Sequence, residues 1–121
     1  VPKSFPALLQ ATKLQERASQ VGFDWPDISG AWDKLQEELG ELEEAVLNRA
    51  NFYEELGDVL FSVVNVARFL KLNPEEALLA TIRKFRARFA YVEKMMQTSG
   101  KSNQDFDLEQ LNQWWEESKQ E

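Results

Sequence analysis

Residues 55–70 read ELGDVLFSVVNVARFL, and this stretch decides the fold class. Its apolar residues recur at helical spacings, which predicts a helix over about residues 52–70. They also cover most of the circumference of that helix, and a helix that is apolar nearly all round is buried on nearly all sides. A domain of 121 residues could just bury such a helix, whereas a partner subunit would bury it more easily. We therefore expect a homodimer or a higher homo-oligomer.

The segments on either side of this helix carry the same periodicity, without a convincing strand pattern. Pro26 excludes helix at Trp25, so a loop with two aromatic side chains is expected there. Asn73 and Asp107 are typical helix caps and predict two later helix starts. The further helices are expected at about residues 7–19 and 31–47, from residue 74 to a polar linker at 97–104, and at 108–117. The predicted fold is an all-α, four- to five-helix bundle.

The composition limits the chemistry that this chain can perform. The formal net charge is −7, which argues against nucleic acid as a partner, and neither cysteine nor histidine is present. Thiolate and imidazole chemistry is therefore excluded, which leaves carboxylates, Lys, Arg, hydroxyl groups, water and hard metal ions. The apolar stretches are too short and too polar to span a membrane, and a cytoplasmic location is expected. We expect residues 1–121 to form a single domain, which could be part of a longer protein because no initiating Met is present.

Two short sequences in the chain match each other and carry its most informative pattern. ELGE at residues 38–41 lies on the second expected helix, and ELGD at residues 55–58 lies on the third. Each places two carboxylates three residues apart, which puts them on one face of a helix. The short connection makes the two helices antiparallel neighbours, so the four carboxylates can face each other. Each sequence also has a glycine inside a helix, which leaves space for a backbone or a hydrated ion.

The third helix indicates what these carboxylates could bind. Glu55, Asp58, Ser62 and Asn65 form a narrow polar stripe on a helix that is otherwise apolar. Partly buried carboxylates are costly unless they are paired, and a hard divalent cation removes that cost. Carboxylates and water suit Mg²⁺, or alternatively Mn²⁺, and magnesium sites typically also bind substrate phosphates. The alternative is that these acids form an ordinary solvated face, which is expected for some of Glu37, Glu43 and Glu44.

A basic cluster complements the acids. Lys84 and Arg88 are four residues apart and share one helix face, where they could hold phosphate groups. Arg83 and Arg86 are better explained as a solvated face that pairs with the excess of acids. Since the carboxylates and a triphosphate are both strongly negative, the site makes electrostatic sense as an assembly of acids, metal and polyphosphate.

The order and spacing of these residues resemble the MazG family of nucleoside triphosphate pyrophosphohydrolases. The central motif is Glu37-Glu38-x-x-Glu41, thirteen intervening residues, and then Glu55-x-x-Asp58. The resemblance covers nearly the whole chain, which is similar in particular to the C-terminal of the two related domains in many full-length members. It also includes VGFDW at residues 21–25, WDKL at 32–35, and the pairs Lys84-Phe85 and Arg88-Phe89.

The resemblance implies a dimeric, all-α, Mg²⁺-dependent enzyme that cleaves nucleoside triphosphates between the α and β phosphates. It implies that metal ions polarise the phosphates and activate the water that attacks the α-phosphorus. Glu37 would support the metal ligands or act as the base for that water. By resemblance, the metal ligands are Glu38, Glu41, Glu55 and Asp58; the phosphate contacts are Lys34, Lys84 and Arg88; and the base contact is Trp115.

Several alternatives remain open at the level of sequence. Relatives with the same fold cleave dUTP, dCTP or phosphoribosyl-ATP. The chain also departs from the family pattern at Ile82 and Asn51, two positions where relatives can carry polar or basic residues. A non-catalytic helical dimer that binds nucleotides or a protein partner is the alternative function. A nucleic-acid-binding function rests on residues 83–88 alone and ranks third.

Overall fold

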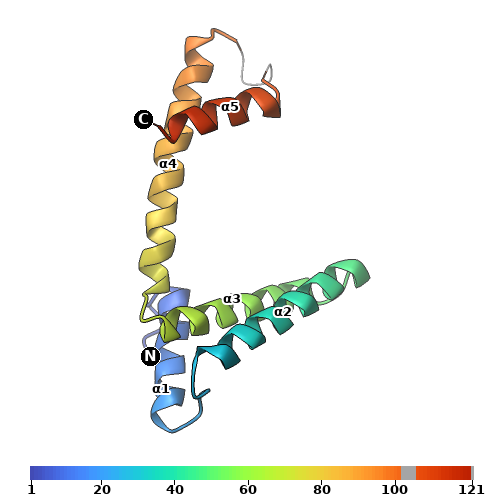
Figure 1. Cartoon of the computed structure of the whole chain (residues 1–121), viewed down its shortest axis with the longest axis vertical. Helices are drawn as coiled ribbons and strands as arrows, with labels where there is room; N and C mark the ends of the chain where they lie inside the picture. Colours follow the sequence, from blue (N-terminus) through green and yellow to red (C-terminus); the bar gives the residue numbers. More distant parts are fainter. Residues whose placement is uncertain (102–105, 121) are drawn as a thin grey trace. The chain divides into compact units, whose positions relative to one another are not determined.

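The computed structural model describes residues 1–101 and 106–120, and the described residues form helices without strands, which confirms the all-α class. The chain divides into two compact units, Val1–Ala77 and Leu78–Glu121, which are described separately below. The helices are α1 (Ala7–Gln20), α2 (Ile28–Asn48), α3 (Phe52–Phe69), α4 (Pro74–Thr98) and α5 (Leu108–Ser118) (Figure 1). The expected linker at 97–104 lies partly outside the described residues, and its first two residues belong to α4.

Side-chain caps set three of the helix starts. The Asn73 side chain accepts hydrogen bonds from the backbone amides of Glu75 and Glu76, and Asp107 accepts one from Gln110, so both predicted caps are confirmed. Helix α2 begins three residues earlier than expected, because the Asp27 side chain accepts a hydrogen bond from the Ser29 amide. The extra turn brings Ile28 and Gly30 into the helix.

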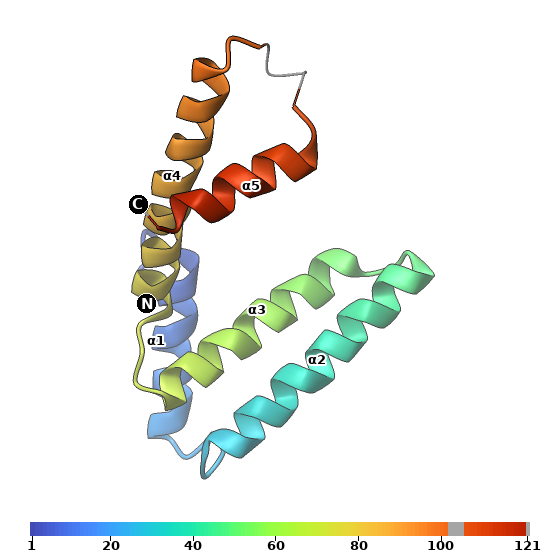
Figure 2. The same cartoon turned by 45° about the horizontal axis from the view of Figure 1, so that its top comes forward.

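A tight connection turns the chain between α2 and α3. Arg49 and Asn51 both adopt the left-handed backbone conformation, with φ of 52° and 61°. The Ala50 amide donates a hydrogen bond to the carbonyl of Ala45, which closes the end of α2. The two helices therefore run antiparallel and side by side, as Figures 1 and 2 both show. This arrangement is the one expected from the short connection.

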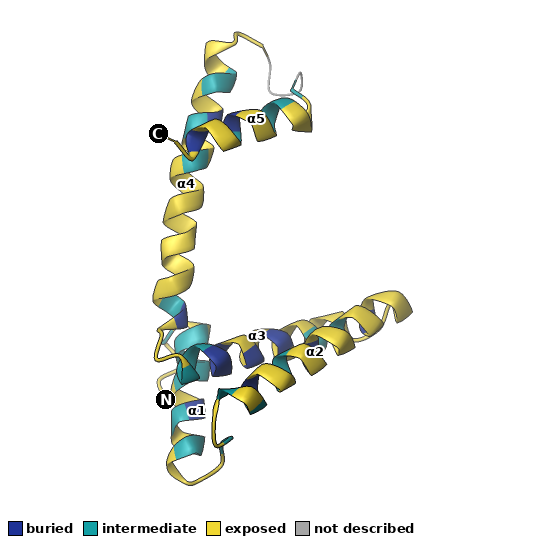
Figure 3. Ribbon diagram, in the orientation of Figure 1, coloured by how far each residue is buried: buried dark blue, intermediate teal, exposed yellow. Residues whose placement is uncertain are grey.

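The core of the first unit lies where α3 packs against α1 and α2. Gln15 of α1 is buried, and its side-chain nitrogen donates a 3.0 Å hydrogen bond to the carbonyl of Phe61 in α3. This bond ties the two helices together across 46 residues of sequence. The buried apolar side chains of this unit are Ala31, Ala45, Val59, Val64 and Val66 (Figure 3).

The apolar surface of α3 is only partly covered within this chain. Val64 is fully buried, whereas Leu56, Leu60 and Phe61 remain 45–49% exposed. Burial on nearly all sides was expected, and the described residues do not provide it. Since large apolar side chains gain about 25 cal/mol for each Å² removed from water, this face favours contact with a further surface.

The second unit consists of α4 from Leu78 onward and α5. Val92 and Trp114 are its buried apolar side chains among the described residues. Phe106 meets the Trp114 ring edge-on, with ring centroids 5.4 Å apart. The Tyr91 hydroxyl donates a 3.0 Å hydrogen bond to Glu117, which joins the two helices. In neither unit is a described helix both long enough and apolar enough to cross a bilayer.

Candidate active site

Three carboxylates meet where α2 faces α3. Glu38 comes from α2, and Glu55 and Asp58 come from one face of α3. Each offers one oxygen, and these three oxygens all lie within 4.8 Å of one another. Glu38 is buried, Glu55 is half-buried and Asp58 is exposed, so the cluster is open to solvent on the Asp58 side. The antiparallel pairing of the ELGE and ELGD segments produces this arrangement.

Two oxygens of the cluster lack partners. Glu38 Oε2 and Glu55 Oε2 are both buried and accept no hydrogen bond. A buried carboxylate oxygen without a partner costs free energy, and neighbouring negative charges add to that cost. A hard divalent cation bound by carboxylate oxygens removes both penalties at once. The donor set and its unpaired oxygens therefore fit such an ion.

Glu41, the fourth expected ligand, does not belong to the group of three but lies in its electrostatic field. Its side chain is exposed on α2, one helical turn from Glu38. The negative charge of Glu38 raises the pKa of Glu41 above its ordinary value, and the charges of Glu55 and Glu37 act in the same direction. Negative charge therefore accumulates on this part of α2 and α3.

Lys34 is the cation that lies directly beside the cluster. Its ammonium nitrogen lies 3.0 Å from Glu38 Oε1 and 3.4 Å from Glu37 Oε1. The hydrogen bond with Glu38, followed by that with Glu37, raises the pKa of Lys34 above its ordinary value. Glu37 itself is exposed and contacts the site through the hydrogen bond that it accepts from Lys34. Lys34 neutralises one oxygen of Glu38 and leaves the other unpaired.

The remaining candidates belong to the second unit. The guanidinium of Arg88 lies over the Trp115 ring, 5.9 Å from its centroid, and is half-buried. Trp115 also contacts Phe85, with ring centroids 5.1 Å apart. Lys84 is exposed on α4. The structure therefore brings Arg88 and Trp115 together and leaves Lys84 open to solvent.

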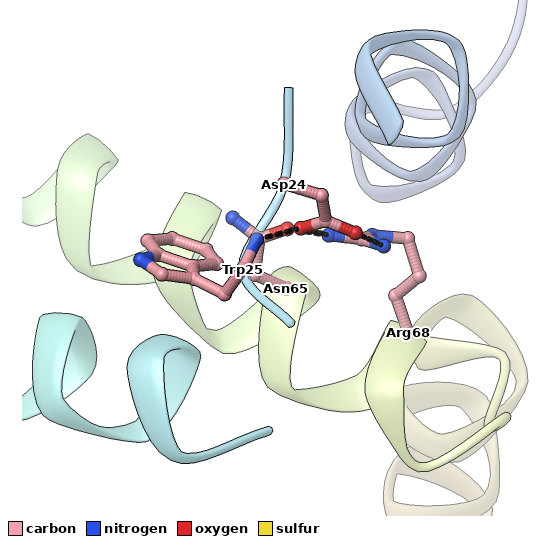
Figure 4. A network of polar contacts seen from close by, with 4 residues as sticks. All are labelled: Asp24, Trp25, Asn65 and Arg68. Atoms are coloured by element: carbon pink, nitrogen blue, oxygen red, sulfur yellow. Dashed lines mark hydrogen bonds and ion pairs between the residues drawn. The ribbon is translucent and has the colours of Figure 1, made fainter. Parts of the chain in front are cut away.

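The sequence analysis missed one polar network in the first unit. Arg68 of α3 donates two hydrogen bonds to Asp24, at 2.7 and 2.8 Å, and a third of 2.8 Å to Asn65 (Figure 4). The hydrogen bond from Arg68 is the largest cause that lowers the pKa of Asp24 to about 2. One feature of the sequence could have indicated this network, namely the arginine at position 68 on an otherwise apolar helix. A half-buried guanidinium needs a carboxylate partner.

The model of the MazG nucleotide pyrophosphohydrolase domain matches residues 30–93, which is more than half of the chain. The chain belongs to the MazG family. The MazG match contains every candidate site residue except Trp115. It covers α3 completely, all of α2 except its first two residues, and most of α4.

Named relatives extend the similarity over nearly the whole chain. The chain is 46% identical over 114 residues to the nucleoside triphosphate pyrophosphohydrolase/pyrophosphatase MazG of Thermotoga maritima, covering 94% of this chain and 44% of that protein. It is 39% identical over 123 residues to the Escherichia coli nucleoside triphosphate pyrophosphohydrolase, covering 98% of this chain and 47% of that protein. It is 46% identical to the Bacillus subtilis protein YabN, over 99% of this chain and 25% of that protein. The chain thus spans less than half the length of these curated relatives.

Proposed function

We propose that this domain hydrolyses nucleoside triphosphates between the α and β phosphates and releases a nucleoside monophosphate and pyrophosphate. The observation that carries the proposal is the cluster of Glu38, Glu55 and Asp58. One oxygen from each lies within 4.8 Å of the others, and Glu38 Oε2 and Glu55 Oε2 are buried without a hydrogen-bond partner. The MazG match over the same residues and the names of the relatives support the same reaction.

The proposed cofactor is Mg²⁺, with Mn²⁺ as an alternative. Glu38, Glu55 and Asp58 would hold it, and Glu41 would join them because the cation removes the repulsion that now raises its pKa. When bound, such a cation supplies positive charge to the phosphate oxygens and makes a coordinated water more acidic. The carboxylates would hold this charge where α2 and α3 face each other.

Basic and aromatic side chains of the domain would bind and orient the triphosphate. Lys34 already carries its charge to the edge of the cluster and can share it between Glu38 and a phosphate oxygen. Lys84 and Arg88 are proposed as further phosphate contacts, and Trp115 as an aromatic surface for the base or for the Arg88 guanidinium that lies over its ring. Together these groups would stabilise the charge of the leaving pyrophosphate.

The reaction balances with water as the other reactant. The oxygen of water forms a bond to the α-phosphorus, and the bond from that phosphorus to the bridging oxygen breaks. The bond pair leaves with pyrophosphate, and the proton of the attacking water passes to a carboxylate. Glu37 is the proposed acceptor, since it is exposed and hydrogen-bonded to Lys34 at the edge of the site.

We also propose that the domain works as a homodimer or a higher homo-oligomer. The half-exposed apolar side chains of α3 support this proposal, because a second copy would remove them from water. A nucleic-acid partner is not proposed, given the net charge of −7.

The decisive experiment is identification of the products by ³¹P NMR after incubation with each common ribo- and deoxyribonucleoside triphosphate and Mg²⁺. In H₂¹⁸O, the label is expected in the nucleoside monophosphate and absent from pyrophosphate. Formation of nucleoside diphosphate and phosphate would overturn the proposed bond cleavage. Absence of any product from a folded protein would favour the non-catalytic binding module instead.

A further inference from the structure

A pocket of about 550 Å³ lies between α1 and the turn that joins α3 to α4, within the first unit (Figure 1). We call it the Lys71 pocket. Among the described residues that line it, none belongs to the candidate active site. Its lining includes Lys13 and Glu16 of α1, Arg68 of α3, and Lys71, Leu72 and Asn73 of the turn.

The charged residues of the lining leave an excess of positive charge in this pocket. Lys13 lies 3.6 Å from Glu16, and Arg68 is paired with Asp24 at 2.7 Å. Within the described part of the chain, Lys71 takes part in no ion pair, and it is exposed, so a ligand can reach it. On a domain with a net charge of −7, a pocket with unbalanced positive charge attracts an anion more strongly than the surrounding surface does.

Lys71 has a backbone conformation that favours glycine. Its φ is 62°, in the left-handed region. The Lys71 amide donates to the carbonyl of Arg68 at 3.1 Å, and the Leu72 amide donates to that of Ala67 at 3.0 Å, which closes the end of α3. Glycine is the usual residue at this position of a helix end, because a Cβ is sterically disfavoured there. A lysine costs stability at this position, and such strain concentrates at ligand sites.

Asn73 supplies a neutral donor to the pocket. Its Oδ1 accepts hydrogen bonds from the amides of Glu75 and Glu76, at 2.9 and 3.2 Å. Because only the oxygen of a side-chain amide can accept, these bonds fix its orientation and leave its nitrogen to donate to a ligand. The carboxylate among the described lining residues, Glu16, is already paired with Lys13. The pocket is therefore rich in donors and fits a ligand whose oxygens only accept.

We propose that the Lys71 pocket is a second binding site, separate from the carboxylate cluster, for a small organic anion that carries a phosphate or a carboxylate group. Lys71 and Lys13 would supply positive charge to this group, and the Asn73 amide would donate a hydrogen bond to one of its oxygens. Leu9 and Leu72 also line the pocket, and its volume is in the range that holds a small molecule. The inference does not depend on the proposed function, since it needs neither a metal ion nor hydrolysis.

The first test measures binding of the anionic group alone. Metal-free protein labelled with ¹⁵N is titrated with inorganic phosphate and with succinate at constant ionic strength, and the side-chain amide of Asn73 is observed by NMR. Without metal, the negative carboxylate cluster repels both anions and does not compete. A saturable shift at Asn73 is expected with at least one of them, and the tighter anion identifies the preferred group. Absence of a saturable shift with both anions would overturn the proposal.

The second test uses variants that remove the binding groups and keep the local fold. Lys71→Gly removes the charge and suits the left-handed backbone, whereas Asn73→Asp keeps an oxygen that caps α4 and removes the donor. Each variant should bind the tighter anion about tenfold or more weakly, because a charge-assisted hydrogen bond is lost. Each should also be at least as stable as wild type in thermal unfolding. Lys94→Gln, at an exposed position of α4 in the second unit, removes the same charge and should bind as wild type.

Three outcomes of this comparison would contradict the inference. Unchanged binding in both Lys71→Gly and Asn73→Asp would place the anion elsewhere and overturn it. An equal loss in Lys94→Gln would show that binding follows the net charge of the domain instead of this pocket. A lower melting temperature of Lys71→Gly would assign the lysine to closing α3, and the proposal would then lose its reason for a lysine at this position.

Discussion

The ammonium of Lys34 lies 3.0 Å from Oε1 of Glu38, while Oε2 of the same carboxylate is buried without a hydrogen-bond partner. One half of the Glu38 carboxylate thus has a counter-charge, and the other half has none. Since Glu55 Oε2 is also unpaired and buried, the site carries an electrostatic cost that a divalent cation would remove. The proposed function depends on this relationship.

Binding of Mg²⁺ or Mn²⁺ is expected to raise the melting temperature, because a ligand that binds only the folded state stabilises it. Asp58→Asn should lose most of this shift, and without metal it should be at least as stable as wild type, since a repelling charge is gone. Calorimetry with and without metal measures both effects. Glu44→Gln, an exposed acid of α2, serves as the control and should keep the full shift.

Breaking the Asp24–Arg68 pair should destabilise the domain by about 3 kcal/mol at neutral pH, because Asp24→Asn leaves a half-buried guanidinium without its charge partner. The folded-state pKa of Asp24 is lowered to about 2, so the contribution of its charge is complete above about pH 4 and is lost as pH falls toward 2. Denaturant unfolding from pH 7 to pH 2 tests this. The difference between wild type and Asp24→Asn should narrow over that window, and a constant difference would contradict the assignment.

Replacing Gly30 of α2 and Gly57 of α3 by alanine should change the stability of the domain in opposite directions. A Cβ at Gly30 would overlap the Trp25 ring, so Gly30→Ala is expected to cost about 1–3 kcal/mol and to change Trp25 fluorescence. Apart from its chain neighbours and the nearby backbone of its own helix, no described heavy atom lies within 4 Å of a Cβ added at Gly57. Gly57→Ala should therefore stabilise α3 by up to about 1 kcal/mol. Chemical unfolding of both variants compares the two. Destabilisation by Gly57→Ala would show that this position is covered, as it would be by a second copy of the chain.

The two tryptophans of α5 should differ in how much they contribute to stability. Trp114 is 9% exposed and meets Phe106, so Trp114→Ala is expected to destabilise the second unit by about 3 kcal/mol. Trp115 is half-buried under Arg88, and its replacement by alanine should cost less stability. Thermal unfolding followed by circular dichroism ranks the two variants. The reverse order would contradict the burial described here.

The helices and the carboxylate cluster were predictable because local patterns determine them. Capping by Asn73 and Asp107 depends on backbone amides two or three residues away, and both caps are confirmed. The spacing of Glu55 and Asp58 determines that they share a helix face, and a short turn brings Glu38 opposite them. The start of α2 was placed too late because the cap formed by Asp27 was overlooked.

Contacts between residues distant in sequence were not predictable in the same way. Arg68 and Asp24 are 44 residues apart, and no periodicity relates them. Gln15 belongs to an otherwise unremarkable helix, and its burial follows from the bond to Phe61. Such contacts depend on how the helices pack against one another, and the periodicity of a single helix does not specify that packing. The pocket of about 470 Å³ that Leu14, Trp25 and Phe61 help to line arises from these contacts, and the sequence analysis therefore did not identify it.

The most direct test of the central claim is release of pyrophosphate from nucleoside triphosphates by wild type, Asp58→Asn and Glu44→Gln, each with and without Mg²⁺. The account predicts Mg²⁺-dependent release by wild type and Glu44→Gln, and at least about a hundredfold slower release by folded Asp58→Asn, since a ligand of the proposed metal is lost. Release by Asp58→Asn at the wild-type rate would contradict the claim that Glu38, Glu55 and Asp58 form the catalytic centre.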